Sequence, residues 1–576
     1  MSNLGLISFD IFDTLITRTV VNPTMIFAIM QNALQQMSFN LPNCLVKNFY
    51  YVRVKSEKFV RENLRINENK SEISLCDIYD YIQLNFDLTE KQKDNHLNLE
   101  MQIEGKNIVP IIENINKLKE FVLQGYKVIL ISDMYLPSEA IRNILIKFDQ
   151  IFEKLEIYVS SEYNKKKSNK SMYNYLKKIY TPTHWIHFGD NYIADFFIPI
   201  SMGIKACYYR KNRLTSYEKY ILKEQKQNLN IDLLVGCAKN LRLKEENEKY
   251  IFGASFAAPI LYIYVKWVLS QCRSKKIRHL YFVARDGFLL KQIADKLNFN
   301  NEFITHYFCT SRKACSSIKK ENREMLLSLY IDQELPQSEN CVAFIDINGS
   351  GKTQDYITEC LNKLRACTTY NFYLHNTTTV KQNAKSIKCS MIPLTDSEDW
   401  VEYLCRCPEG QTIGYYYNEN NIIVPLKEKN CADSMEKWGF EDYKNGIFDY
   451  VDEIVKVESN NNIDISDFLL FDLMNQYIHN HLDKKTADII GSIPFASLGE
   501  EHNTVVAEQI NLVNLFCPKY TDYISIARCN KLIKPIVYLI KTIINPRTYA
   551  YINKDKNLAY LKIYKYKLDI RKLIWR

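Results

Sequence analysis

Four short segments in the N-terminal third of the chain combine residue types that could transfer a phosphoryl group to a carboxylate. Each ends an apolar run or opens the helix after it, at residues 10–14, 128–133, 165–170 and 187–195. Together they supply an aspartate, a hydroxyl, a lysine cluster and an acidic pair, the groups that this transfer requires. Asp10 and Asp190 would repel each other at neighbouring strand ends, so the pattern also indicates a bound cation.

A parallel sheet is needed to bring these segments together. The apolar runs 6–10, 128–132, 157–160 and 185–189 predict strands, and helical patterns separate them. Residues 1–210 are therefore expected to form a doubly wound parallel α/β sheet. The polar, helix-rich stretch of about 20–118 follows the first strand. We expect it to be a helical cap over the carboxyl edge of the sheet, where open α/β folds bind ligands.

The four segments resemble the four motifs of the haloacid dehalogenase (HAD)-like hydrolase superfamily, over about residues 1–210. The strings SFDIFDTLITR, ISDMYLP and HFGDNYIAD further resemble large two-part bacterial HAD-like proteins, many of which accompany enzymes of surface polysaccharide biosynthesis. The resemblance implies a Rossmann-like hydrolase, a phosphatase or phosphotransferase that forms an aspartyl-phosphate and needs Mg²⁺. The implied substrate is a small sugar- or nucleotide-like phosphometabolite, and the implied partners are polysaccharide-assembly proteins.

The resemblance also implies catalytic residues. Asp10 would be the nucleophile, Ser132 would hydrogen-bond the phosphoryl oxygens, and Lys167 would pair with both the carboxylate and the phosphoryl group. Lys170 is the reserve choice for this lysine. The further residues expected to bind substrate are Thr14, Asp133 and Lys170. Other roles stay open, because these side chains could instead cap a helix, hold a loop or be solvated.

A magnesium site is implied as well. The expected ligands are the carboxylates of Asp10 and Asp190 and the backbone carbonyl of Phe12, with Asp195 supporting the metal shell. Phe12 departs from the family's phosphatases, which usually carry an aspartate there as general acid and base. Three interpretations remain: a phosphatase of activated phosphates, a phosphoryl-binding domain with little turnover, or an enzyme that recruits its acid from Asp13 or the cap.

A second α/β domain is predicted for residues 250–394, after a helical connector at 211–249. Its segments 282–288 and 344–353 each run from a strand through a tight turn into a helix, which aims backbone N–H groups at an anion. They resemble the phosphate-binding turns of type I phosphoribosyltransferases, which implies a transferase. Ordinary strand-to-helix turns are the alternative. The candidates for a second polar site are Arg285, Asp286 and Asp346.

The composition fits a soluble globular protein of several domains, with 576 residues, 47% hydrophobic and 24% charged. Sixteen cysteines without regular spacing, and no export signal, predict a cytoplasmic protein. The most apolar stretch, 251–265, is expected to be a buried helix too short to span a bilayer.

Much of the net charge of +9 lies in residues 547–576, where nine Lys and Arg stand against two Asp among many tyrosines. This tail is expected to be a terminal helix, or else a peripheral contact to the inner face of the membrane. No nucleic-acid partner is expected. Residues 395–576 as a whole are expected to be mixed to helical. Two alternatives to a HAD-like hydrolase therefore remain: a bifunctional protein whose second domain does the main chemistry, or a non-catalytic phosphate-binding scaffold at the membrane.

Overall fold

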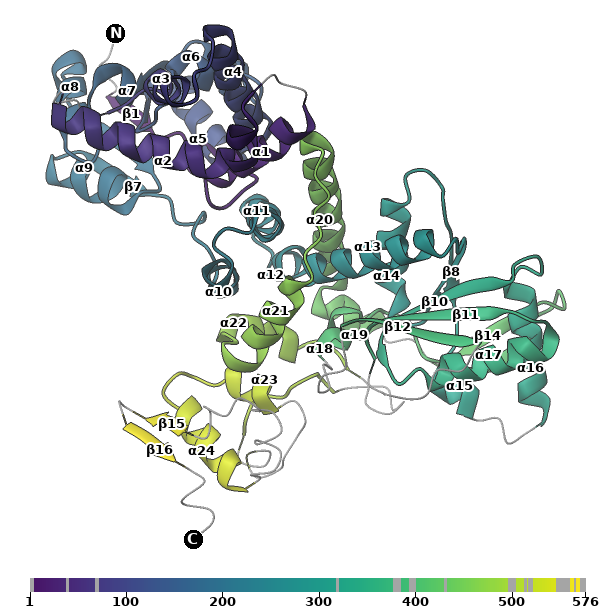
Figure 1. The fold of residues 1–576 in the computed structure, drawn as a ribbon. Helices are drawn as coiled ribbons and strands as arrows, with labels where there is room; N and C mark the ends of the chain where they lie inside the picture. The colour runs from purple at the N-terminus through teal and green to yellow at the C-terminus, as the bar shows by residue number, and fades with distance from the viewer. Residues whose placement is uncertain are drawn as a thin grey trace. The chain divides into compact units, whose positions relative to one another are not determined.

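The structure is a computed structural model of the chain (Figure 1). It describes residues 5–37, 41–67, 72–316, 321–376, 385–392, 400–428, 432–495, 504–511, 515, 522–544, 560–563 and 566–569. The chain divides into two compact units. Unit 1 comprises Met1–Glu246 and Glu453–Ile465, and unit 2 comprises Asn247–Asp452 and Ser466–Arg576. Both units contain a parallel sheet with helices, so the expected α/β class with two such domains is observed.

Unit 1 is built on a five-stranded parallel sheet with the order β5-β4-β1-β6-β7. Its strands are β1 (Leu6–Phe9), β4 (Lys127–Ser132), β5 (Glu156–Val159), β6 (Trp185–Gly189) and β7 (Lys205–Tyr208). The central strand β1 is buried along its whole length, which explains its unbroken apolar sequence. Phe9 pairs with Leu130 of β4 and Phe188 of β6, so these three strands end at the same edge.

The helices around this sheet alternate with its strands, as a doubly wound fold requires. They are α5 (Ile112–Leu123), α6 (Ser138–Leu145), α7 (Ser160–Tyr163), α8 (Ser171–Tyr180) and α9 (Ile198–Ser201), with the short helices η1 (Gln150–Glu153) and η2 (Tyr192–Phe197).

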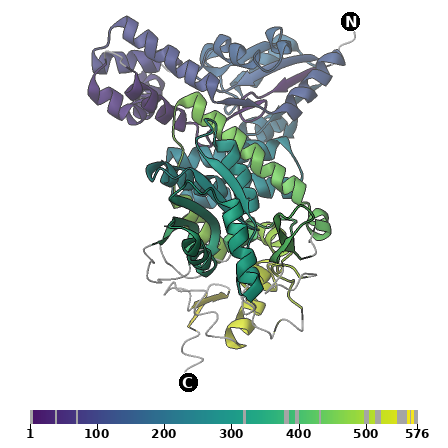
Figure 2. The same ribbon diagram turned by 90° about the vertical axis from the view of Figure 1, so that its right-hand side faces the viewer.

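The cap is inserted after the first strand, as the sequence predicts. It begins and ends in an antiparallel pair, β2 (Ile16–Arg18) with β3 (Ile108–Pro110). Between them lie α1 (Met25–Gln36), α2 (Asn43–Asn67), α3 (Leu75–Phe86) and α4 (Glu90–Lys106), which gather to one side of the sheet (Figure 2). Capping boxes at Ser74 and Thr89 fix the starts of α3 and α4.

A buried ion pair holds the cap together. Arg53 of α2 donates two hydrogen bonds of 2.8 Å to Glu100 of α4, and the Tyr79 hydroxyl of α3 donates a third, of 2.7 Å, to Glu100. We expect Glu100→Ala to lower the free energy of unfolding by about 3–5 kcal/mol, because it removes the buried partner of the Arg53 guanidinium and leaves it only the bond to the half-buried Glu57. Denaturant unfolding measures this, with the exposed Glu90→Ala as a control that leaves the midpoint nearly unchanged. Equal midpoints for both variants would contradict the assigned role of the pair.

The expected connector at 211–249 is instead largely part of unit 1. It forms α10 (Ser216–Glu224) and α11 (Leu229–Lys244). Helix α11 hydrogen-bonds to the segment between β1 and the cap. The Asp232 carboxylate accepts the N–H groups of Val21 and Asn22, and Asn240 Nδ2 donates to the Arg18 carbonyl. The segment that leads from the candidate nucleophile to the cap is therefore fixed from outside the predicted domain.

Unit 2 holds the second parallel sheet, with the order β12-β11-β10-β8-β9. Its strands are β8 (His279–Val283), β9 (Ile304–Phe308), β10 (Cys341–Gly349), β11 (Thr368–Asn376) and β12 (Ser386–Ile392). The chain goes from β8 to β9 on one side and then crosses to β10 on the other. The crevice between the carboxyl ends of β8 and β10 is thus the topological switch point, where such sheets bind ligands.

The helices of unit 2 begin with α12 (Glu248–Phe252), η3 (Gly253–Ala257), α13 (Ala258–Ser274) and α14 (Gly287–Leu297). They continue with α15 (Arg312–Ser316), α16 (Glu321–Glu334), α17 (Lys352–Leu364), α18 (Trp400–Leu404) and α19 (Ala432–Trp438). Helix α20 (Phe440–Asn461) has residues in both units. Among the described residues, α20 is followed by α21 (Leu469–Asn480), α22 (Lys484–Gly491), α23 (Asp522–Ala527) and a fourth helix near the tail.

The C-terminal tail differs from the expected helix. After α24 (Lys534–Ile544), strands β15 (Tyr560–Ile563) and β16 (Tyr566–Asp569) form an antiparallel pair. The prediction of a terminal helix is therefore wrong for these residues, where alternating tyrosine and lysine suit a strand as well as a helix face. The rest of the basic tail, 547–559, 564–565 and 570–576, lies outside the described residues. A further antiparallel pair in unit 2 joins β13 (Thr412–Tyr417) and β14 (Ile423–Lys427).

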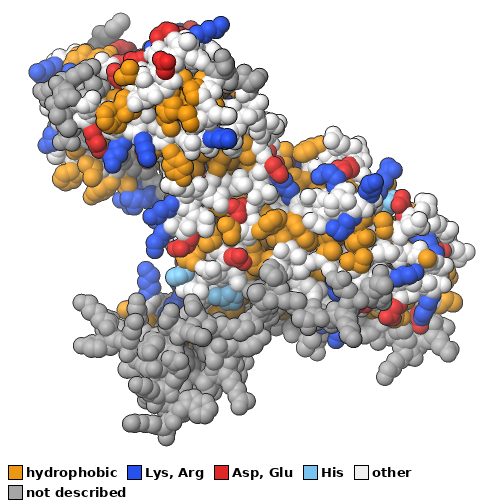
Figure 3. Space-filling view, viewed as in Figure 1, with side chains coloured by type: hydrophobic (Ala, Val, Ile, Leu, Met, Phe, Trp, Pro, Cys, Tyr) orange, Lys and Arg blue, Asp and Glu red, His pale blue; other side chains and the backbone are white. Residues whose placement is uncertain are grey.

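One helical run among the described residues, Glu248–Ser274, is long and apolar enough to cross a membrane by length and composition. It contains the expected buried helix at 251–265 but is longer than predicted. The structure buries 83% of its most apolar window inside the protein, as in a core helix. Elsewhere, hydrophobic and charged side chains are interspersed on the face that Figure 3 shows, as is usual for protein surfaces.

Candidate active site

The centre of the site is a buried pair of Asp10 and Lys167. Asp10 directly follows β1, and Lys167 lies in the loop before α8. Lys167 Nζ is 2.5 Å from Asp10 Oδ1 and 2.7 Å from Asp195 Oδ1. Burial disfavours the charged lysine, but Asp10 and Asp195 outweigh that effect and raise its pKa well above the usual value. The site therefore holds an ammonium group between two carboxylates.

Two residues expected to bind substrate, Thr14 and Asp133, hydrogen-bond to this pair. The Thr14 hydroxyl donates to Asp10 Oδ2 at 3.0 Å and is fully buried. The Asp133 carboxylate accepts the backbone N–H of Lys167 at 3.0 and 3.2 Å, which fixes the lysine loop against the end of β4. Asp133 also lines the cavity of the site, so a substrate contact stays compatible with its position.

A hydrogen-bonded chain behind the lysine orients Asp195. Trp185 Nε1 donates to Ser8 Oγ at 2.7 Å, and Ser8 Oγ lies 2.7 Å from His187 Nδ1. His187 Nε2 then lies 3.1 Å from Asp195 Oδ1. Ser8 Oγ accepts a hydrogen bond from Trp185, so its own hydroxyl proton is donated to His187 Nδ1. The neutral His187 ring then carries its proton on Nε2 and donates it to Asp195. Burial lowers the pKa of His187, in keeping with a neutral ring.

Asp195 serves first to position Lys167. Its Oδ1 accepts from Lys167 and His187, and its Oδ2 accepts the backbone N–H of Asn191 at 3.1 Å. Burial alone would raise the pKa of Asp195, but Lys167 and His187 hold it well below the usual value. The sequence resemblance implies a place for Asp195 in the metal shell but no role for its partner His187.

Three carboxylates converge at the same edge. Ligand atoms of Asp10, Asp190 and Asp195 all lie within 4.8 Å of one another. Burial, with added repulsion from Asp13 and Asp195, raises the pKa of Asp190 to about 7. Burial also raises the pKa of Asp10, with Asp195 and Asp190 adding to it and Lys167 opposing it. One ammonium group does not balance this charge, and hard carboxylate oxygens so placed fit a Mg²⁺ ion.

A cavity of about 270 Å³ opens onto these groups. Its lining includes all the expected catalytic and metal-binding residues: Asp10, Phe12, Ser132, Lys167, Asp190 and Asp195. It also includes Arg18 and Tyr135, which lie outside the four sequence motifs. Lys170 does not line it: this residue is exposed at the start of α8, with a φ of 67°. The structure thus favours Lys167 over the reserve candidate.

Asp13 is poorly suited to replace the missing proton shuttle at position 12. Its Oδ1 accepts from the Thr17 hydroxyl at 2.7 Å and lies 3.6 Å from Lys239 Nζ, which α11 supplies. Burial would raise the pKa of Asp13, but Lys239 and Thr17 more than offset it, so the pKa is lowered. A carboxyl group with a lowered pKa is ionised at neutral pH and has no proton to donate as a general acid.

The three unit 2 candidates lie at the switch point of its sheet. Arg285 and Asp286 follow β8, and Asp346 lies near the end of the neighbouring β10. Burial and the charge of Asp286 raise the pKa of Asp346 to about 7, although Gln354 donates to its Oδ2 at 2.7 Å. Burial raises the pKa of Asp286 as well, opposed by Arg285 and Arg406. The negative charges of Asp286 and Asp346 therefore repel each other in this site.

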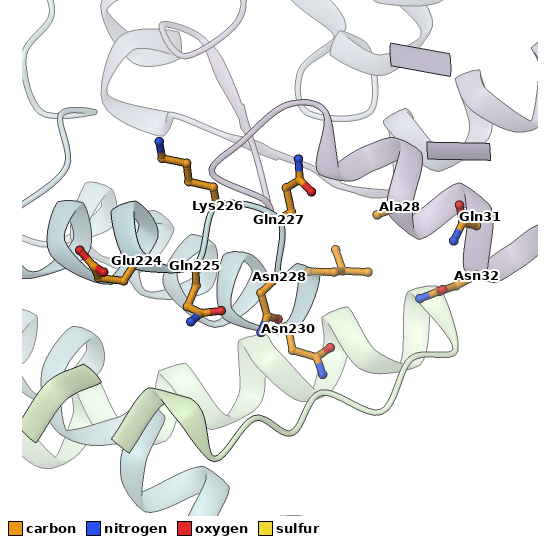
Figure 4. Close-up of a pocket in the computed structure, with 10 residues that line it drawn as sticks. Ala28, Gln31, Asn32, Glu224, Gln225, Lys226, Gln227, Asn228 and Asn230 are labelled. Atoms are coloured by element: carbon orange, nitrogen blue, oxygen red, sulfur yellow. The ribbon is translucent and has the colours of Figure 1, made fainter. Parts of the chain in front are cut away.

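A larger cavity in unit 1, of about 620 Å³, lies between α1 and the junction of α10 and α11 (Figure 4). Its lining is dominated by amide side chains: Gln31, Asn32, Gln225, Gln227, Asn228 and Asn230. Its charged groups are Glu224 and Lys226. The cavity with the carboxylate–lysine pair is therefore the better candidate for chemistry, although it is smaller.

No protein-family model and no curated protein matches the chain. Among solved structures the chain is similar to one titled a dehalogenase, with 11% identity, a TM-score of 0.23 and coverage of 34% of this chain and 80% of the other. It is also similar to a 2-haloacid dehalogenase from Pseudomonas syringae pv. Tomato DC3000, with 12% identity, a TM-score of 0.27 and coverage of 37% and 88%. Fold and site geometry define unit 1 as a doubly wound α/β domain with a capped, buried carboxylate–lysine centre.

Proposed function

We propose that unit 1 is a HAD-like hydrolase domain that transfers a phosphoryl group from a small phosphorylated metabolite to Asp10. The contact of Lys167 with both Asp10 and Asp195 carries this proposal, because it places a permanent cation beside a buried carboxylate at the ligand-binding edge of the sheet. A cavity of about 270 Å³ suits a small metabolite.

Each residue has a distinct task in this proposal. An Asp10 carboxylate oxygen attacks phosphorus, while the Thr14 hydroxyl holds the other oxygen in place. Lys167 offsets the repulsion between the carboxylate and the anionic phosphoryl group, and Ser132 offers a hydroxyl to a phosphoryl oxygen from the end of β4. Asp195 and His187 keep the lysine aimed at this point.

Mg²⁺ fits the acidic edge of the cavity. Asp10 and Asp190 would hold it, with the carbonyl of Phe12 as the expected third protein ligand and Asp195 beside them. Bound there, the ion would neutralise charge on the phosphoryl oxygens.

Removal of the metal is expected to lower turnover by at least about 10²-fold, since the like charges of the site would then repel the substrate. Assays in excess EDTA, followed by MgCl₂, test this. Calorimetric titration with MgCl₂ should show binding to wild type and at least about tenfold weaker binding to Asp190→Asn. Full activity in EDTA would contradict the metal's role.

A haloacid dehalogenase would also use Asp10 as its nucleophile; one similar structure is titled a 2-haloacid dehalogenase and the other a dehalogenase. The third carboxylate near Asp10 and Asp195, with its pKa raised to about 7, favours phosphoryl chemistry with a cation. The two activities separate in a panel of phosphometabolites and 2-haloacids, run with Mg²⁺ on wild type and Asp10→Asn. We expect wild type to release phosphate and Asp10→Asn to release none. Release of halide without phosphate would favour a dehalogenase over a phosphoryl-transfer enzyme.

For unit 2 we propose a separate ligand site at its switch point, with a phosphoribosyltransferase-like transferase as the candidate activity. The opposed acids Asp286 and Asp346 beside Arg285 support it. Asp346→Asn should then remove the transferase activity and spare Asp10-dependent turnover. The proposed setting in surface polysaccharide biosynthesis rests on the sequence resemblance, and the proposed position at the cytoplasmic face of the membrane rests on the basic, tyrosine-rich tail and the irregular cysteine spacing.

A further inference from the structure

Arg18 is an almost fully buried arginine with open donors in the cavity of unit 1. It is 7% exposed and lines the cavity that contains Asp10 and Lys167. Its Nε donates to Glu104 Oε1 at 2.7 Å, whereas neither Nη group hydrogen-bonds a residue in the described part of the chain. Glu104 and the nearby charge of Asp13 stabilise the guanidinium. The two Nη groups remain available to donate to an anion in the cavity.

The guanidinium is held in place from several sides. Its Cζ lies 4.5 Å above the centre of the Phe12 ring, the residue that replaces the expected proton shuttle. Glu104 of the cap fixes Nε, and Asn240 of α11 donates to the Arg18 carbonyl at 3.0 Å. Such a group is ordered before substrate binds, so little entropy is lost when it meets an anion.

The chemistry of Arg18 differs from that of the aspartate that the family's phosphatases usually carry at position 12. A guanidinium does not release a proton at neutral pH, so Arg18 cannot protonate an alkoxide leaving group. It can stabilise an oxygen that leaves as an anion, through two parallel N–H groups. The pairing of Arg18 with Phe12 therefore suits a leaving group that needs charge stabilisation and no proton.

We propose that the substrate of this site is a phosphoric anhydride, an acyl phosphate or a diphosphate, whose leaving carboxylate or phosphate is bound by Arg18. The proposal rests on the phosphoryl transfer to Asp10 inferred above. An Asp10 oxygen forms a bond to phosphorus while the anhydride P–O bond breaks, and its electron pair leaves with the carboxylate or phosphate oxygen. No proton moves in this step. Water then cleaves the aspartyl-phosphate, and its proton passes to the released phosphate or to solvent.

The volume of the cavity limits the leaving group. At about 270 Å³ it is below the range of roughly 300–1,000 Å³ that is usual for drug-sized ligands. A short acyl chain or a single phosphate fits this limit better than a nucleoside. Arg18 thus becomes a specificity-determining residue for small anhydrides.

The test compares acetyl phosphate and pyrophosphate with glucose 6-phosphate on the full chain with Mg²⁺. We expect wild type to favour at least one anhydride over the alkyl phosphate by at least about 10²-fold in kcat/KM. Arg18→Met should lower kcat/KM for that anhydride by about 10²–10³-fold and change the glucose 6-phosphate value by less than about threefold. Arg18→Lys should recover part of the loss. The matched control is Arg242→Met, which removes an arginine paired with Glu218 away from the cavity.

Each outcome decides the matter. An equal loss for all substrates in Arg18→Met, or a wild type that hydrolyses glucose 6-phosphate as fast as both anhydrides, would overturn the role of Arg18. If Arg18→Met does not fold, the wild-type ranking alone still decides. The two anhydrides distinguish a carboxylate from a phosphate leaving group. Absence of any Asp10-dependent turnover would instead refute the phosphoryl transfer itself.

Discussion

Lys167→Met is expected to lower kcat/KM for the best phosphorylated substrate by about 10³-fold or more, the largest loss we expect from any residue other than Asp10. Lys167 is 3% exposed and lies between Asp10 and Asp195, so methionine would leave two buried carboxylates facing an anionic substrate. Steady-state kinetics on the purified variant measure the loss.

The matched control is Lys170→Asn, three residues further along the same loop. Lys170 is exposed and has a positive φ, which asparagine tolerates better than most residues. We expect its kcat/KM to stay within about twofold of wild type, because Lys170 does not line the cavity. A larger loss in Lys170→Asn than in Lys167→Met would show that Lys170, the reserve choice, is the catalytic lysine.

Phe12→Asp is expected to raise kcat/KM for alkyl phosphomonoesters by about 10²-fold, since it adds a general acid and base two residues after the nucleophile. We expect the lower end of the usual range of 10²–10⁴, because the Arg18 guanidinium, 4.5 Å from the present ring, would keep the new carboxyl ionised. Phosphate release from glucose 6-phosphate measures the gain.

Phe12→Asn is the control for this gain of function. It removes the aromatic ring and adds a polar group of the same shape as aspartate, but it cannot transfer a proton. We expect no gain in Phe12→Asn. Similar rates in the two variants would mean that the proton shuttle is not what limits wild type.

The strands of both sheets could be predicted because buried parallel strands read as unbroken apolar runs. The run Trp185–Gly189 is a strand over the predicted residues, and Val128–Ser132 differs from β4 by one residue. The tail was harder, since tyrosine and lysine at 560–569 fit either a helix or a strand, and pairing between β15 and β16 decides the outcome.

The candidate site was predictable where residues follow strands and unpredictable where distant segments supply them. Asp10 and Asp190 could be placed because each directly follows a strand of the same sheet. Lys239 meets Thr17 across 222 positions of sequence, and Glu104 meets Arg18 across 86. Neither segment has a motif, and such contacts appear only when α11 and the cap fold onto the sheet.

His187 was visible in the sequence but its role was not. It lies on β6 with its side chain fully buried, where a packed histidine is the ordinary interpretation. Its function as a donor to Asp195 depends on Ser8 and Trp185 on neighbouring strand positions, which only the register between β1 and β6 brings together.

Covalent labelling of Asp10 tests the central claim most directly. Wild-type protein with Mg²⁺ and acetyl phosphate is quenched in acid during turnover, digested, and analysed by mass spectrometry, with Asp10→Asn treated in parallel. We expect one phosphoryl group on the peptide that contains Asp10, removed by hydroxylamine as an acyl phosphate should be, and no label in Asp10→Asn. Turnover without a label on this peptide, or a label that persists in Asp10→Asn, would contradict Asp10 as the nucleophile.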